Sequence, residues 1–118
     1  MRKLILLLGI LLVACTGNDT GLVGGGDYDA LAQCMTDSEV KFYGAYWCTN
    51  CQKQKEDFGA SWGLIDAVEC STPDGQAQVQ VCTLAGIKAY PTWEFPDGSR
   101  KTGRLPLEEL SELSSCSI

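Results

Sequence analysis

The chain has 118 residues, of which 45% are hydrophobic, and its 15 acidic and 9 basic side chains give a net charge of −6. This length suits a single domain. The negative charge excludes nucleic acid and anionic lipid head groups as partners held by charge attraction, because like charges repel.

The N-terminal residues 1–14 are predicted to be a lipoprotein signal peptide. Arg2 and Lys3 precede an apolar run over residues 4–13, and the sequence LVAC that ends at Cys15 matches a bacterial lipobox. The apolar run is too short to span a bilayer, which argues against a transmembrane anchor. Similarity to bacterial lipoproteins implies cleavage before Cys15 and its lipidation. We therefore expect a lipid-anchored, extracytoplasmic protein of the bacterial cell envelope, on the periplasmic face or the cell surface.

Residues 15–26 are expected to form a flexible tether between the lipid and the domain. They are rich in glycine and small polar residues and show no hydrophobic period. Residues 27–118 are expected to form the domain itself. Its first element is predicted to be a short amphipathic helix over residues 27–37, because apolar side chains recur there at helical spacing after an aspartate that can cap the helix.

A pair of cysteines lies where a buried strand is predicted to meet a surface helix. Residues 40–45 are mostly apolar, whereas residues 52–57 are polar and are expected to be solvated. Between them, Cys48 and Cys51 form a CxxC motif. Unpaired backbone N–H groups in the first helical turn favour thiolate over thiol, so Cys48 is the expected nucleophile. Cys51 lies one turn later on the same face and can form a disulfide with Cys48, which gives a redox-active centre without any other cofactor.

Two alternatives to a redox centre can be weighed from the sequence. A CxxC motif can be half of a zinc site, but such a site usually needs a second ligand pair. The chain has no histidine and no second CxxC, so no metal site is predicted. A structural disulfide that never turns over is the other alternative, because short-range bridges persist in oxidising compartments.

The remaining cysteines indicate further disulfides. The chain has seven cysteines, and setting aside Cys15 leaves those at positions 34, 48, 51, 70, 82 and 116. An even number in a small exported chain indicates bridges that supplement a modest core. Apart from Cys48 with Cys51, the spacing alone does not settle the pairing.

The second half of the domain is predicted to contain a strand, a helix, a hairpin and a last helix. Residues 64–70 form a strand, far enough from the first for a parallel crossover. The hairpin joins residues 92–95 to residues 99–104 through a Pro-Asp-Gly turn. The last helix opens at Pro106. The leucines expected to face inward from it are Leu107, Leu110 and Leu113.

The segment between the strand and the hairpin fits two patterns. Residues 77–82 alternate as in a strand, yet four apolar residues share one helical face, with Asp74 as a cap and Gly86 as a stop. We predict a helix. The residues of its apolar face are Ala77, Val81, Leu84 and Ala85.

This order of elements predicts a thioredoxin-like domain: a three-layer α/β/α sandwich with a central four-stranded mixed sheet that lacks the extra N-terminal strand. Several ordered motifs carry a closer resemblance. They are the run FYGAYWC, the CQKQK after it, the VEC strand, Cys82, Ile87 with YPTW, and Gly103. Over about residues 40–113 these motifs resemble the thioredoxin-like domain that is fused to bacterial vitamin K epoxide reductase homologues.

The resemblance implies roles for residues outside the CxxC motif. Pro91 corresponds to the cis-proline of the fold, although a trans-proline that opens a strand is the alternative. Tyr90, just before it, would offer backbone hydrogen bonds to an extended substrate, and Trp47 would also contact substrate. The matched Cys70 and Cys82 would form a structural disulfide. This chain has no membrane domain of the resembling proteins, so the resemblance implies a separate membrane disulfide oxidase or reductase as a partner, and the absence of such a partner is the alternative.

The chain departs from the resembling pattern at two places. It has CTNC where the family commonly has CPHC, and without that histidine the disulfide should be less strongly oxidising. It also has Phe42 where many thioredoxins have a buried aspartate that accepts the proton of the resolving cysteine. Glu69 or water is the candidate substitute.

Cys34 and Cys116 are the two remaining cysteines, and the resembling domain has no counterpart that assigns them partners. Exported thiols tend to oxidise, which favours a bridge between the N-terminal helix and the C-terminus. The first and last helices of a thioredoxin-like fold usually cover opposite faces of the sheet, which opposes that bridge. An intermolecular disulfide is the alternative.

Together these features predict an extracytoplasmic thiol-disulfide oxidoreductase that acts on protein thiols or disulfides. A non-catalytic binding module that has kept the fold, or a copper or zinc carrier, is the alternative.

Overall fold

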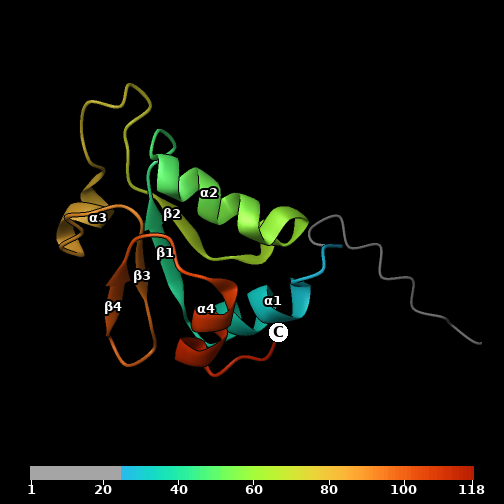
Figure 1. The fold of residues 1–118 in the computed structure, drawn as a ribbon. Helices are drawn as coiled ribbons and strands as arrows, with labels where there is room; N and C mark the ends of the chain where they lie inside the picture. Colours follow the sequence, from blue (N-terminus) through green and yellow to red (C-terminus); the bar gives the residue numbers. More distant parts are fainter. Residues whose placement is uncertain (1–24) are drawn as a thin grey trace, which may run out of the picture.

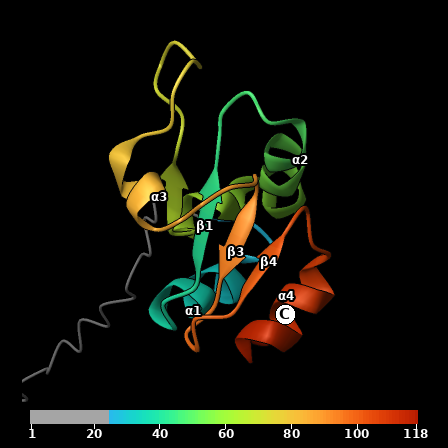
Figure 2. The same cartoon turned by 90° about the vertical axis from the view of Figure 1, so that its left-hand side faces the viewer.

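The computed structural model describes residues 25–118 (Figures 1 and 2). The predicted signal peptide, the lipidation of Cys15 and most of the predicted tether lie outside these residues. No helix within residues 25–118 is long and apolar enough to cross a membrane.

A mixed sheet of four short strands forms the centre of the domain, which confirms the predicted fold class. The strands are β1 (Lys41–Gly44), β2 (Ala67–Glu69), β3 (Thr92–Glu94) and β4 (Arg100–Thr102). Their order in the sheet is β2-β1-β3-β4. β1 runs parallel to β2 and antiparallel to β3, and β3 and β4 form the predicted hairpin. The parallel pair requires a long crossover, which the helix with the CxxC motif supplies.

Helices cover the two faces of the sheet unequally. They are α1 (Asp29–Asp37), α2 (Thr49–Phe58), the 3-10 helix η1 (Gly59–Leu64), α3 (Gln80–Leu84) and α4 (Leu107–Ser114). Side chains from α1, α2 and α4 share one large core with Phe42 and Trp93 of the sheet. On the other face a smaller core joins Tyr43 to the region of α3. Figure 1 shows α3 across the sheet from α1 and α2, so this short helix supplies the third layer of the sandwich.

Several predicted boundaries and faces are wrong. Both parallel strands are shorter than predicted. β2 begins late because Leu64 ends η1 and the chain becomes extended only from residue 65. α3 spans only Gln80–Leu84, and Gln78 before it pairs with Ser71 in an isolated β-bridge. The segment thus contains both a short helix and an isolated strand-like residue pair, as its two sequence patterns suggested.

The predicted apolar faces of α3 and α4 are also partly wrong. Val81 and Leu84 are 57% and 78% exposed, because Cys82 is the residue that faces the sheet. In α4, Leu110 is buried but Leu113 is exposed. Helix α4 ends in a left-handed residue, Ser115, and the chain then turns back toward the core.

Gln54 lies in the stretch that was expected to be solvated, yet its side chain is completely buried. Its Oε1 accepts hydrogen bonds from the Trp93 indole N–H (3.1 Å) and the Leu105 backbone N–H (2.8 Å). Its amide Nε2 donates to the Leu105 carbonyl at 3.0 Å. These bonds satisfy the buried amide and fix α2 against β3 and the segment before α4.

Two disulfides close the domain. Cys70 and Cys82 are joined with a Cα–Cα distance of 5.6 Å, and Cys34 and Cys116 with a distance of 5.9 Å. The expected obstacle to the second bridge is absent, because α1 and α4 pack on the same face of the sheet.

Candidate active site: the Cys48–Cys51 dithiol

Cys48 lies at the junction between the sheet and α2. β1 ends at Gly44, and Cys48 is the N-cap residue of α2, with an extended backbone. Its N–H donates to the Ala45 carbonyl at 3.0 Å, which closes the turn before the helix. Its Sγ accepts a hydrogen bond from the Cys51 N–H at 3.3 Å. The sulfur therefore lies beside the unpaired N–H groups that open the helix, on a residue that is only half-buried.

Cys51 lies one turn into the helix and is 6% exposed. Burial raises the pKa of its thiol to about 12, with further contributions from the hydrogen bond to Cys48 and the charge of Glu69. The pair thus combines an accessible sulfur with a buried one. Both are thiols in the structure.

Gly44 makes room for the buried thiol. A Cβ atom at this position would lie 3.1 Å from the Cys51 sulfur and 2.5 Å from the Phe42 ring. A larger residue at the end of β1 would therefore displace either the dithiol or a core aromatic ring.

A pocket of about 300 Å³ opens beside Cys51. Phe42, at the position where many thioredoxins have an acid, forms part of its wall. Glu69 and Lys55 are the charged side chains that line it. The Glu69 carboxylate accepts a hydrogen bond from the Tyr46 N–H at 2.9 Å, so it is held at the rim of the pocket. The pocket thus brings Cys51 and Glu69, one of the two candidate proton acceptors, to the same cavity.

Trp47 and Tyr90, the predicted substrate-binding residues, meet beside the dithiol. Their rings are 5.7 Å apart in an edge-to-face arrangement, and Trp47 remains 50% exposed. The Tyr90–Pro91 peptide bond is cis, and Pro91 is buried. Tyr46 is a third aromatic side chain at this end of the domain, 52% exposed, to which the sequence assigned no role.

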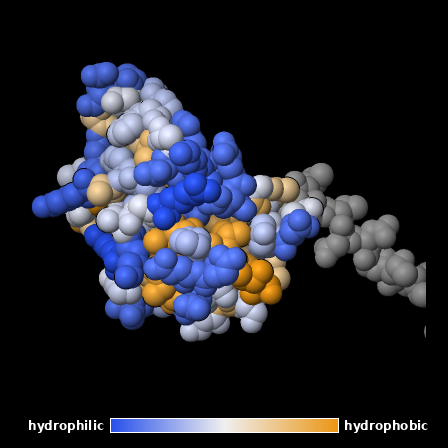
Figure 3. All heavy atoms as spheres, in the orientation of Figure 1, coloured by the Kyte–Doolittle hydropathy of each residue, from blue (hydrophilic) through white to orange (hydrophobic). Residues whose placement is uncertain are grey.

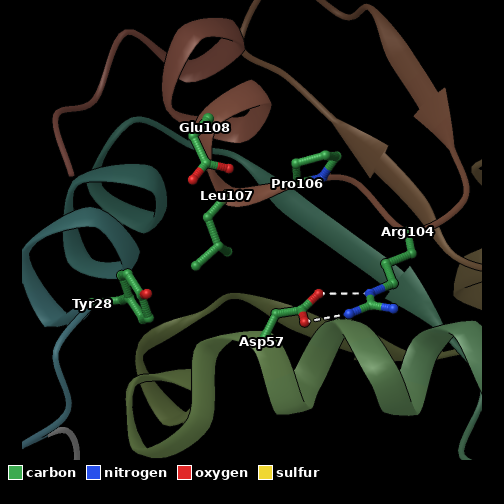
Figure 4. A pocket seen from close by; sticks show the side chains of 6 residues that line it. All are labelled: Tyr28, Asp57, Arg104, Pro106, Leu107 and Glu108. Atoms are coloured by element: carbon green, nitrogen blue, oxygen red, sulfur yellow. Dashed lines mark hydrogen bonds and ion pairs between the residues drawn. The ribbon is translucent and has the colours of Figure 1, made fainter.

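A larger pocket, of about 480 Å³, lies between α1, α2 and the start of α4 (Figure 4). Its guanidinium, on Arg104, already forms a pair of hydrogen bonds with Asp57. On the face shown in Figure 3, hydrophobic side chains are visible in the middle and lower part among hydrophilic ones, whereas the top is mostly hydrophilic. This pocket is lined by neither cysteine of the dithiol, so it is not the candidate site.

Metal-ligating side chains do not gather elsewhere in the described domain. No group of three or more histidine, cysteine, aspartate or glutamate residues within residues 25–118 is placed to hold a metal ion.

Two plant proteins are similar to this chain. "Thiol-disulfide oxidoreductase LTO1" of Arabidopsis thaliana is 36% identical over 94 residues, which cover 75% of this chain and 24% of that protein. "Protein disulfide isomerase-like 2-2" of Oryza sativa subsp. japonica is 32% identical over 104 residues, 75% of this chain and 28% of that protein. The chain thus spans about a quarter of the length of these relatives. No protein-family model matches it.

These relatives agree with what the structure shows. A mixed sheet, a CxxC motif at the start of the crossover helix and a cis-proline occur together in one small domain. Both relatives carry names that denote thiol and disulfide chemistry. Residues 25–118 therefore form a thioredoxin-like redox domain, and the chain is similar to a part of each of these two relatives.

Proposed function

We propose that the protein exchanges electrons with protein thiols or disulfides through Cys48 and Cys51, outside the cytoplasm. The observation that carries this proposal is the asymmetry of the pair. The Cys48 sulfur is accessible at the start of α2, and Cys51 is buried one turn behind it. The Cys48 sulfur can therefore react with a substrate disulfide, and the Cys51 sulfur can then resolve the mixed disulfide.

The reaction can be written with atoms and electrons balanced. The Cys48 thiolate attacks one sulfur of a substrate disulfide, so that a mixed disulfide forms and one substrate thiolate leaves. Cys51 then loses its proton, and its sulfur attacks the Cys48 sulfur. The second substrate thiolate leaves, the substrate has gained two electrons, and the Cys48–Cys51 pair is oxidised. The reverse sequence oxidises a substrate dithiol.

Trapping tests this proposal directly. A Cys51→Ala variant cannot complete the second step, so it should accumulate mixed disulfides with substrate proteins through Cys48. A Cys48→Ala/Cys51→Ala variant should trap none. If the wild-type protein neither reduces insulin nor oxidises dithiols, and Cys51→Ala traps nothing, the domain is a binding module instead.

The lipobox before Cys15 supports attachment to the envelope by lipid, and the acidic chain offers no charge attraction to lipid head groups. A separate membrane disulfide oxidase or reductase is the proposed source or acceptor of electrons, by resemblance to the fused reductase proteins. Replacing Cys15 with serine should release the protein from the membrane fraction. Continued membrane attachment of that variant would contradict the lipid anchor.

The resolving step should depend steeply on pH. Once Cys48 is in a mixed disulfide, burial and the charge of Glu69 still hold the pKa of Cys51 above that of an ordinary thiol. Below a raised pKa the thiolate fraction increases tenfold with each pH unit, so release of a bound peptide should accelerate about tenfold per unit between pH 6 and 8. Rapid-quench mass spectrometry of a preformed mixed disulfide measures this rate.

A matched variant isolates the charge of Glu69. Glu69→Gln keeps an oxygen for the Tyr46 N–H but removes the charge, so the pKa of Cys51 should fall and release at pH 7 should quicken. If Glu69 instead accepts the Cys51 proton, the variant should slow release. A rate that is flat above pH 6 would contradict the buried, protonated thiol.

The missing histidine sets the expected reduction potential. CTNC lacks the cation that would stabilise the Cys48 thiolate, so the disulfide should be only weakly oxidising. We expect a value near that of thioredoxin, about −270 mV, and far from the strongly oxidising value of about −120 mV. Equilibration with glutathione buffers measures it. A potential above roughly −160 mV would contradict the argument from the missing histidine.

A further inference from the structure

The segment between Cys70 and Cys82 forms a closed loop beside the dithiol. We call residues 71–79 the disulfide loop, because they lie within the segment that the Cys70–Cys82 bridge closes. The Val79 N–H donates to the Cys70 carbonyl at 2.8 Å, and Ser71 pairs with Gln78. In Figures 1 and 2 the loop projects beyond the end of the sheet, and its outer surface is largely hydrophilic in Figure 3.

The tip of the loop is also held by its own hydrogen bonds. The Thr72 hydroxyl donates to the Asp74 carboxylate at 2.5 Å, and the Ala77 N–H donates to the Thr72 hydroxyl at 3.2 Å. The Gln76 N–H donates to Asp74 at 3.0 Å. These bonds make the loop a defined support rather than a loose connection.

Three different loop residues form hydrogen bonds with three aromatic side chains near the dithiol. The Trp47 indole N–H donates to the Ser71 hydroxyl at 2.9 Å. The Tyr46 hydroxyl donates to the Pro73 carbonyl, also at 2.9 Å. The Gln78 amide donates to the Tyr90 hydroxyl at 2.6 Å. We call Tyr46, Trp47 and Tyr90 the aromatic platform.

Gly75 allows the loop to approach this platform closely. Its φ of +73° lies in the left-handed region, and a Cβ atom there would lie 3.2 Å from the Tyr46 hydroxyl and 3.6 Å from the Trp47 ring. The loop and the platform are therefore fitted to each other.

The platform leaves large ring surfaces in water next to the accessible sulfur. Tyr46 and Trp47 are about half exposed although their polar atoms are bonded to the loop. Rings whose orientation is fixed in advance lose little entropy when they bind, and their faces suit apolar side chains and peptide groups. A small thiol such as glutathione has little surface to cover them.

From these contacts we infer that the disulfide loop determines substrate preference, with Ser71 and Gln78 as positioning residues. They hold the aromatic platform for an extended polypeptide that has an apolar or aromatic side chain next to its disulfide cysteine. This inference rests on the proposed thiol-disulfide exchange, and it assigns to the Cys70–Cys82 bridge a role in substrate binding in addition to stability.

Two substrates test the inference: a peptide disulfide with a phenylalanine beside its cysteine, and glutathione disulfide. Ser71→Ala and Gln78→Ala each remove one bond between the loop and a platform ring. Gln78→Ala also removes the bonds of that side chain to the Ile87 carbonyl and the Thr83 hydroxyl. Each variant should raise KM for the peptide about threefold to tenfold, the factor expected when one side chain must be ordered on binding. The rate with glutathione disulfide and kcat for the peptide should stay within about twofold.

Matched variants separate positioning from general damage to the fold. Ser71→Thr keeps the hydroxyl and should restore the peptide KM. Tyr46→Phe removes only the bond to the loop at a half-exposed position, so it should fold and raise the peptide KM. Gln76→Ala lies in the same loop, where its side chain bonds only to Asp74, and should change nothing.

The outcomes distinguish this inference from the proposed function. No reaction of the wild-type protein with either disulfide would defeat the proposed function itself. A wild type that reacts with both, and whose Ser71→Ala, Gln78→Ala and Tyr46→Phe variants keep the wild-type KM for the peptide, would overturn the inference alone. Equal losses with both substrates would overturn it too, because the loop would then act on the dithiol and not on substrate preference.

Discussion

Replacing Cys48 with serine is expected to lower disulfide exchange by a factor on the order of 10³ or more, because the hydroxyl of serine is a far weaker nucleophile than a thiolate at neutral pH. The half-buried Cys48 is the more accessible member of the pair, and Cys51 is the other free thiol within residues 25–118. Cys51 is buried and keeps its proton because its pKa is raised, so it cannot replace Cys48 in the first step.

The matched variant Cys51→Ser should behave differently. It keeps the first attack and should form mixed disulfides at near the wild-type rate, but it should not release them. Quenched-flow alkylation with a chromogenic disulfide follows both steps. Equal reactivity of Cys48→Ser and Cys51→Ser in the first step would contradict the assignment of Cys48 as the attacking residue.

The position of the dithiol could be predicted because its signals are local. The sequence changes from apolar to polar within a few positions of Cys48, which predicts that a strand ends and a helix begins there. Cys48 is indeed the N-cap residue of α2. The central sheet and its parallel crossover follow from the same alternation of strands and helices.

The parts that could not be predicted depend on distant partners. Gln54 is polar and lies among polar neighbours, but it is buried because its partners Trp93 and Leu105 are 39 and 51 residues away. Leu84 is exposed because the disulfide to Cys70 turns Cys82 toward the sheet. The predicted apolar face of the helix then points away from the sheet. Contacts between residues so far apart produce no periodic pattern of apolar residues from which they could be predicted.

The aromatic platform illustrates the same limit at the site. The sequence places Trp47 beside Cys48, but the residues that hold its ring lie beyond the second strand. Ser71 is 24 residues from Trp47, and Gln78 is 12 residues from Tyr90. The family resemblance implied a bridge between the cysteines that flank this segment, but it did not show what the enclosed loop contacts.

Removing the Cys34–Cys116 bridge should have the largest effect on stability. The bridge joins α1 to the segment after α4 across a sequence separation of 82 residues, whereas the Cys70–Cys82 bridge spans 12. In the chain-entropy model, the longer loop contributes about 4.5 kcal/mol and the shorter about 3 kcal/mol to the free energy of unfolding. Small domains have about 5–15 kcal/mol in total, so the loss would be a large part of it.

The expected result is that Cys34→Ala/Cys116→Ala lowers the melting temperature by about 20 °C or more, since each kcal/mol corresponds to about 4–8 °C in a domain of this size. Alanine fits the site because Cys116 is almost fully buried and a polar replacement would add its own cost. Calorimetry of this variant beside Cys70→Ala/Cys82→Ala measures the difference, with glutathione disulfide reduction as the check that the dithiol is intact. A smaller loss from the longer bridge would contradict the loop-closure argument. Unchanged melting, together with a wild-type dimer that dissociates on reduction, would show that Cys34 and Cys116 pair between molecules.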